Sequence, residues 1–192
     1  MEKDQMKEKI KVVVIGGSAG SLEVLLQLLP KLHSIPDFAL VIVLHRKNAE
    51  DSTLENLIAM KTIVPVVEIE DKTPIQAGAI YIGPSDYHLL FEKDNTFALD
   101  VSEKINFSRP SIDLAFESAA DVFGPELTGI LLSGANADGT NGLKAIKRER
   151  GTTIVQLPES AEMPFMPNHA KLNANPDFIL DIPEILNYIM PQ

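Results

Sequence analysis

The chain has 192 residues, of which 45% are hydrophobic and 23% are charged, proportions typical of a globular domain long enough to bury a core of its own. Its net charge of −10, from 17 basic and 27 acidic residues, repels phosphate backbones and anionic lipid, so we expect no nucleic-acid partner. The absence of cysteine excludes disulfides, a thiolate nucleophile and cysteine-ligated zinc.

Residues 1–10, MEKDQMKEKI, are charged throughout and lack the apolar centre of a signal peptide. No apolar run along the chain approaches the roughly 18 residues of a membrane-spanning helix. We therefore expect a cytoplasmic protein that is not inserted into a membrane. No linker or internal repeat interrupts the rest of the chain, which predicts a charged tail over 1–10 and a single domain over 11–192.

Short apolar runs then alternate with segments of helical period. Strands are expected at 11–15, 38–44, 79–83, 127–132, 152–156 and 178–180. Helices are expected near 21–32, 51–60, 111–123, 139–149, 167–173 and 182–190. This alternation is typical of βαβ crossovers and predicts an α/β fold with a doubly wound, mainly parallel sheet and helices on both faces.

Two further patterns refine this expectation. FALVIVL at 38–44 and LTGILL at 127–132 are continuously apolar, as central strands covered on both faces should be. The segment YHLLFEKDNTFALDVS sets Asp94 and Asn95 between two apolar stretches, which predicts an antiparallel hairpin. We expect that hairpin at one edge of the sheet.

Reactive groups of doubly wound sheets gather at the carboxyl ends of the strands. Three such ends carry a serine, an imidazole and a carboxylate: Ser18 follows the first strand, His45 follows FALVIVL, and Asp138 lies in the loop ANADGTNG. Together these groups could form a nucleophile, its base and the acid that orients the base. Each also has a structural interpretation, since Ser18 and Asp138 suit turns and helix N-caps and His45 could be a surface group.

The glycine-rich turn GGSAG at 16–20 matches the spacing of the G-x-S-x-G nucleophile elbow, and the N-terminus of the following helix directs amide N–H groups at developing negative charge. The alternative is a dinucleotide site, but the G-x-G-x-x-G pattern is broken at Ser18. No acidic residue ends the second strand to hold an NAD ribose. Arg46 could still hold an NADP 2′-phosphate, so an NADP-binding reductase remains open.

Several ordered motifs resemble those of the CheB-type chemotaxis protein-glutamate methylesterases, over nearly the whole chain. They are VVVIGGSAGS, VIVLHR, AIYIGPSDYHLLF, FSRPSIDLAFESAA, LTGILLSGANADGTNGLKAIK and QLPESAEMPFMPNHAK. The resemblance implies a catalytic domain that removes methyl groups from glutamyl γ-methyl esters on the cytoplasmic helices of chemoreceptors, with glutamine deamidation as a second activity. It implies no cofactor. Ser18 matches the nucleophile, His45 the base and Asp138 the orienting acid.

The chain departs from this family pattern in three respects. Ser21 stands where relatives usually carry glycine, and Ala135 stands where they usually carry a methionine associated with the oxyanion hole. Backbone N–H groups at Ala19 and Ala135 remain the expected oxyanion donors. Full-length relatives begin with a receiver domain, whereas the catalytic motif here begins at residue 11, so a separate receiver protein is an open option as a regulatory partner.

The acidic net charge conflicts with an acidic receptor substrate, because like charges repel. We therefore expect a local basic rim that binds substrate, formed by Arg46 and Lys47 beside His45, with Arg109. The histidines show no metal-ligand spacing such as H-E-x-x-H, so we expect no metal. A catalytically silent relative that acts only as a binding module in a signalling complex also remains open.

Overall fold

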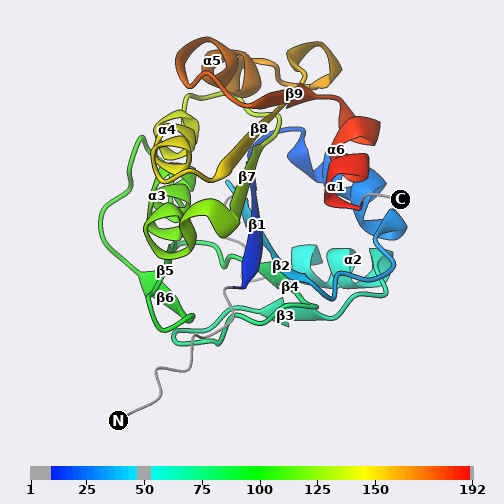
Figure 1. Cartoon of the computed structure of the whole chain (residues 1–192), viewed down its shortest axis with the longest axis vertical. Coiled ribbons are helices and arrows are strands. Elements are labelled where there is room, and N and C mark those ends of the chain that lie inside the picture. The colour runs from blue at the N-terminus through cyan, green and yellow to red at the C-terminus, as the bar shows by residue number, and fades with distance from the viewer. Residues whose placement is uncertain (1–9, 47–52, 191–192) are drawn as a thin grey trace.

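The computed structural model of the chain describes residues 10–46 and 53–190 (Figure 1). The predicted tail over 1–10 therefore lies, apart from Ile10, outside the described residues. So do Lys47 and the first two positions of the helix expected at 51–60.

A parallel sheet with β1 at its centre organises the chain. Its strand order is β3-β4-β2-β1-β7-β8-β9, and every neighbouring pair is parallel. The strands are β1 (Lys11–Gly17), β2 (Phe38–Leu44), β3 (Val66–Glu68), β4 (Ile80–Ile82), β7 (Leu127–Leu131), β8 (Thr152–Gln156) and β9 (Phe178–Leu180). Gly17 pairs with Leu44, and Gly16 pairs with Leu131, so the segments that follow β1, β2 and β7 begin side by side.

Helices cover both faces of this sheet (Figure 1). One face carries α1 (Ser21–Leu28), α2 (Thr53–Lys61) and α6 (Ile182–Ile189), and the other carries α3 (Ile112–Phe123), α4 (Thr140–Arg148) and α5 (Phe165–Asn173). Short 3₁₀ helices η1 (Leu29–Lys31), η2 (Gly124–Glu126) and η3 (Pro158–Ser160) join elements. The predicted doubly wound α/β class is confirmed, as are all six predicted helices. In the described part of the chain, no helix has the length and apolar character needed to cross a membrane.

The central strands alternate their side chains between two buried clusters. In β1, Val12 and Val14 pack with α3, α4 and α5, whereas Val13 and Ile15 pack with α1 and α6. Successive side chains of a strand point to opposite faces, and here both faces are covered by helices. This two-sided burial explains the continuously apolar runs of the central strands.

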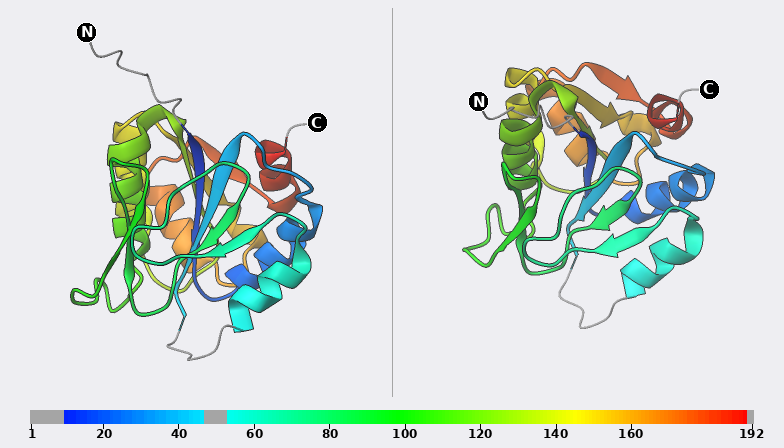
Figure 2. Two further views of the ribbon diagram at one scale, coloured as in Figure 1. Left: turned by 90° about the horizontal axis from the view of Figure 1, so that it is seen from below. Right: turned by 60° about the horizontal axis from the view of Figure 1, so that its bottom comes forward.

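The predicted hairpin is present as β5 (His88–Phe91) and β6 (Phe97–Asp100). It forms a two-stranded sheet of its own beside α3 (Figure 2), and the edges of the main sheet are instead β3 and β9. The reason is apolar packing, since Phe91 contacts the ring of Phe123 in α3 with ring centroids 5.8 Å apart. Strand β3 was not predicted, because it has only three residues and none of them is buried.

Candidate active site

The strand ends around β1 form an open pocket of about 450 Å³. Ser18 and His45 both line it, so the structure brings these two predicted residues to one surface. Its other lining residues are Arg46, Asp86, Lys104, Phe107, Ser108, Arg109 and Asn136. Asp138 is not among them, because it lies fully buried behind His45.

His45 is held by Asp138 through its Nε2 atom. Nε2 lies 2.7 Å from Oδ2 of Asp138, and the two side chains are 11% and 0% exposed. Because a carboxylate only accepts hydrogen bonds, Nε2 carries the proton and Nδ1 carries the lone pair. Two polar groups approach Nδ1: Nδ2 of Asn136 at 3.4 Å and Oγ of Ser108 at 3.5 Å. His45 is therefore oriented so that Nδ1 can act as a base.

Asp138 does not cap the helix that follows it. Its carboxylate instead accepts the backbone N–H groups of Ile112, at 2.7 Å, and Asp113, at 3.0 Å, in the first turn of α3. Burial by itself raises the pKa of Asp138, but the hydrogen bonds from His45 and from these N–H groups outweigh it and hold the pKa below its usual value. Asp138 thus stays ionised beside His45.

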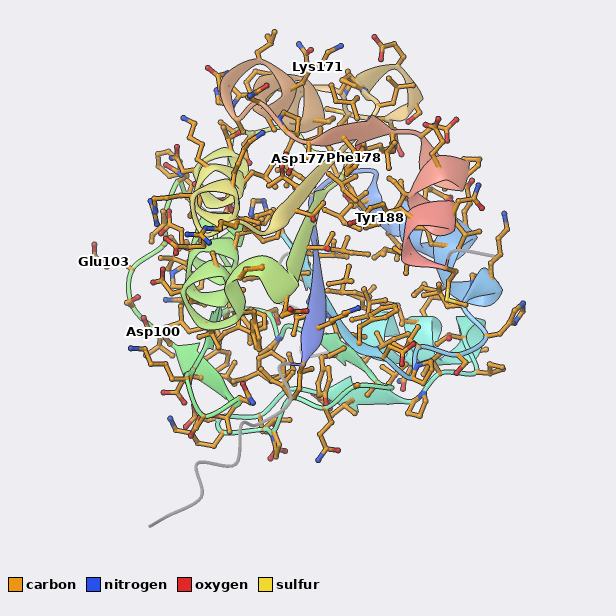
Figure 3. The ribbon with its side chains drawn as sticks, in the orientation of Figure 1. Asp100, Glu103, Lys171, Asp177, Phe178 and Tyr188 are labelled. Atoms are coloured by element: carbon orange, nitrogen blue, oxygen red, sulfur yellow. The ribbon has the colours of Figure 1, made fainter. Side chains whose placement is uncertain are left out.

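A hydrogen-bonded chain extends from Asp138 through Ser111 to His88. Oγ of Ser111 donates to Asp138 at 3.3 Å, its N–H donates to Nδ1 of His88 at 3.1 Å, and Nε2 of His88 donates to the carbonyl of Glu103 at 2.9 Å. The Glu103 side chain itself points outward (Figure 3). His88 is fully buried and fastens the loop 101–110 to the start of α3. Within 10–46 and 53–190, no group of three or more His, Asp and Glu side chains could hold a metal ion.

The turn that carries Ser18 is clamped by two buried serines. The N–H of Ser18 donates to the carbonyl of Ser133 at 2.9 Å and to Oγ of Ser21 at 3.1 Å, and Oγ of Ser21 donates to the same carbonyl at 2.6 Å. A Cβ on Gly17 would clash with Ser21. The N-cap of α1 is Gly20, with φ 82 and no side-chain cap. The side chain of Ser18 therefore has no capping role and is free to face the pocket.

Polar groups around Ser18 lack hydrogen-bond partners within 10–46 and 53–190. Among the described residues, neither Oγ of Ser18 nor the N–H groups of Ala19 and Ala135 make a hydrogen bond. The hydrogen bond expected between Ser18 and His45 is therefore not formed in this structure. Catalytic hydrogen bonds of unliganded enzymes are often long and tighten when substrate binds.

Arg46 and Arg109, two of the residues expected to form a basic rim that binds substrate, already have partners within the protein. Arg46 forms an ion pair with Glu55 of α2 and donates to the carbonyl of Gly83 at 3.3 Å. Nη1 of Arg109 donates to the carbonyls of Val101, at 3.0 Å, and Ser102, at 2.9 Å. Lys47 lies outside the described residues. Among the described residues, the exposed cation on the pocket wall is Lys104, which the sequence analysis did not identify.

A family model described as CheB methylesterase matches residues 13–189. The chain belongs to the CheB methylesterase family. Its structure is similar to the crystal structure of the Thermotoga maritima CheB methylesterase catalytic domain, with a TM-score of 0.86 over 94% of this chain and 97% of that one. The two sequences are 30% identical. This membership agrees with the resemblance drawn from the sequence motifs.

Two curated relatives of the CheB methylesterase family are informative. A Leptospira interrogans chain, named as a candidate protein-glutamate methylesterase/protein-glutamine glutaminase, is 39% identical over 91% of this chain and 91% of its own length. The Thermotoga maritima protein-glutamate methylesterase/protein-glutamine glutaminase is 32% identical over 92% of this chain but only 53% of its own length. This chain therefore spans about half of the longer relative.

Several residues of the site escaped sequence analysis. Asn136 lies in the loop that was already singled out for Asp138, so its proximity to that residue was the available signal. Ser108, Ser111 and Ser133 reach the site through contacts with residues distant in the chain. No local pattern distinguishes these serines from ordinary loop residues.

Proposed function

We propose that the chain is a protein-glutamate methylesterase, a serine hydrolase acting on glutamyl γ-methyl esters of chemoreceptor helices. The observation that carries the proposal is the hydrogen bond from Nε2 of His45 to the buried Asp138, at 2.7 Å. It leaves the Nδ1 lone pair of His45 in a pocket that Ser18 also lines. Membership of the CheB methylesterase family supports the same activity.

In the first half of the reaction, Oγ of Ser18 attacks the ester carbonyl while its proton passes to Nδ1 of His45. Asp138 stabilises the imidazolium that results. The bond between the carbonyl carbon and the methoxy oxygen then breaks, and His45 returns the proton to that oxygen, so that methanol leaves. The product is a glutamyl ester of Ser18.

In the second half, a water molecule takes the place of methanol. Nδ1 of His45 accepts a proton from this water, which attacks the glutamyl-enzyme ester and frees the glutamate carboxylate. The proton returns to Ser18. The same steps applied to a glutamine side chain release ammonia, and the names of the relatives support this second activity.

The negative charge that develops on the carbonyl oxygen needs donors. We assign them to the backbone N–H groups of Ala19 and Ala135, which make no hydrogen bond within the described residues. The N–H of Ser18 is unsuited to this role, because Ser133 and Ser21 occupy it. A backbone donor survives the change of the Ala135 side chain from the family's usual methionine.

The substrate is a protein segment rather than a metabolite. The pocket is open to solvent, and Phe107 on its wall is 96% exposed, as a contact residue for a docking helix would be. The partner is then a methylated cytoplasmic helix of a chemoreceptor, with a separate receiver protein as an optional regulator.

The NADP-reductase alternative loses its main support. Arg46, which would hold the 2′-phosphate, is paired with Glu55 and has its charge compensated. A ligand that binds only the folded protein raises its melting temperature. We expect NADPH not to bind, and therefore to leave the melting temperature unchanged.

The decisive experiment measures methanol release from a methylated receptor fragment. Ser18→Ala and His45→Ala should each lower turnover by about three orders of magnitude or more, because triad members act as a unit. Ser118→Ala is the matched control, since this serine lies in α3 outside the pocket. Normal turnover in folded Ser18→Ala protein would overturn the proposal and leave the binding-module interpretation.

A further inference from the structure

Asn136 presents a hydrogen-bond donor to the pocket in a fixed orientation. Its Oδ1 accepts the backbone N–H of Asp138 at 3.0 Å, and its Nδ2 lies 3.4 Å from Nδ1 of His45. A flipped amide would set its NH₂ group against the N–H of Asp138, which is unfavourable. The contact with Asp138 therefore keeps Nδ2 turned toward the base.

In the proposed mechanism, Nδ2 of Asn136 would also lie beside the leaving atom of the substrate. The histidine nitrogen that takes the proton of the nucleophile later delivers it to the leaving group, so both must approach the same nitrogen. Ser108 makes a similar approach, with Oγ at 3.5 Å from Nδ1. The two neighbours differ in chemistry, because an amide NH₂ only donates hydrogen bonds whereas a hydroxyl donates and accepts them.

We propose that Asn136 is a specificity-determining residue that favours ester over amide substrates, which rests on the proposed function of the site. Nδ2 donates a hydrogen bond to the methoxy oxygen of a glutamyl methyl ester, whose lone pairs accept it. A primary amide offers two N–H donors at the same place, and donor then faces donor. A polar group left unpaired on either side of such a contact weakens binding and catalysis.

The test compares kcat/KM for one receptor fragment that carries either a methyl ester or a glutamine at the same position. This constant reports only the steps up to release of methanol or ammonia, so the later hydrolysis common to both substrates does not enter. Asn136→Ala should lower the ester value by about tenfold or more and leave the amide value nearly unchanged, so that the ratio falls. Asn136→Asp keeps the acceptor for the N–H of Asp138 and should lower the ratio as well.

Ser108→Ala is the matched control, because its hydroxyl can serve either substrate. It should change both values by the same factor. Where ammonia release is too slow to measure, a γ-methyl thioester replaces the amide, because sulfur is a weak acceptor. Asn136→Ala should then cost the ester more than the thioester.

The outcomes separate the two proposals. Hydrolysis that depends on Ser18, with an ester-to-amide or ester-to-thioester ratio that the Asn136 variants leave unchanged, overturns the specificity role alone. Hydrolysis that does not depend on Ser18 overturns the proposed function itself. Equal losses on both substrates in the Asn136 variants also overturn the specificity role and assign Asn136 to support of the loop.

Discussion

Asp113 and Asp138 cap each other's helices. Asp138, just before α4, accepts the N–H groups of Ile112 and Asp113 at the start of α3, and Asp113 accepts the N–H of Gly142 in the first turn of α4 at 2.7 Å. The N-terminal ends of both helices stabilise negative charge. The position of the proposed catalytic carboxylate is thereby tied to the packing of α3 against α4.

The first prediction concerns the pH dependence of stability. Burial is the largest cause that raises the pKa of Asp113 to about 6, and the negative charges of Asp138 and Glu117 act in the same direction. The hydrogen bond from the N–H of Gly142 lowers this pKa but does not outweigh them. When folding raises the pKa of a carboxyl, its contribution to the unfolding free energy is fully present below the ordinary pKa, which is 3.8 for Asp113. The contribution is lost as the pH rises through the folded pKa of about 6. A tenfold change in the acid dissociation constant between the unfolded and folded states corresponds to roughly 1.4 kcal/mol of unfolding free energy.

Asp113→Asn should therefore flatten the decline in unfolding free energy between about pH 4 and pH 6.5, because its amide oxygen still accepts the N–H of Gly142 without ionising. Urea unfolding across this range measures the change. Asp121→Asn is the control, an exposed carboxylate on the same helix. An Asp113→Asn protein whose stability declines with pH as steeply as that of the wild type would contradict the prediction.

The second prediction concerns Asp138→Asn. The carboxylate accepts hydrogen bonds from His45, Ile112, Asp113 and Ser111, so an amide NH₂ must face at least one of these donors. When it faces His45 it imposes the wrong tautomer, and turnover should fall by about 10³- to 10⁴-fold.

The pKa of Asp138 is lowered in the folded protein, which has the opposite consequence for stability. Its contribution is present above the ordinary pKa and is lost as the pH falls. The destabilisation caused by Asp138→Asn should thus be larger at neutral pH than at about pH 3, below the ordinary pKa of 3.8. Unfolding curves at both pH values test this, and equal destabilisation at the two would contradict it.

The sequence could predict the strand-end positions of Ser18, His45 and Asp138 because parallel strands end at a common edge. It could not predict that Asp138 caps α3 or that Arg46 pairs with Glu55. The hydrogen bonds of Asp138 join residues about 25 positions apart in the chain and depend on how the helices pack. The sequence could not predict for the same reason that β5 and β6 form a separate sheet, because the position of this hairpin depends on how its apolar side chains pack against α3.

The third prediction concerns Ser21. Its Oγ accepts the N–H of Ser18 and donates to the carbonyl of Ser133, so Ser21→Ala should loosen the turn that carries Ser18, the proposed nucleophile. We expect a loss of about 1 to 2 kcal/mol in unfolding free energy and a lower kcat with little change in KM. Ser118→Ala is matched, because Ser118 joins the N–H of Phe91 to the carbonyl of Ala115. It should lose similar stability and retain kcat; an equal loss of kcat in both variants would count against a positioning role for Ser21.

The fourth prediction concerns Lys104 and the approach of an acidic substrate. The charge of Arg46 is compensated by Glu55, and Arg109 is bound to the carbonyls of Val101 and Ser102. Lys104 is exposed on the pocket wall and forms no ion pair with any described residue. In a protein of net charge −10, such a cation beside Ser18 and His45 should attract the proposed substrate, a helix that grows more acidic as methyl groups leave.

Lys104→Glu should lower kcat/KM for methylated receptor by about three- to tenfold at low salt, and the loss should shrink at about 0.5 M salt as screening takes hold. A small neutral glutamyl ester carries no charge for Lys104 to attract, so its hydrolysis should stay near the wild-type rate. Lys93→Glu makes the same charge change on an exposed residue between β5 and β6, away from the pocket lining, and should have a smaller effect. Equal losses on both substrates, or a loss indifferent to salt, would mean that Lys104 supports the shape of loop 101–110 and that steering lies elsewhere.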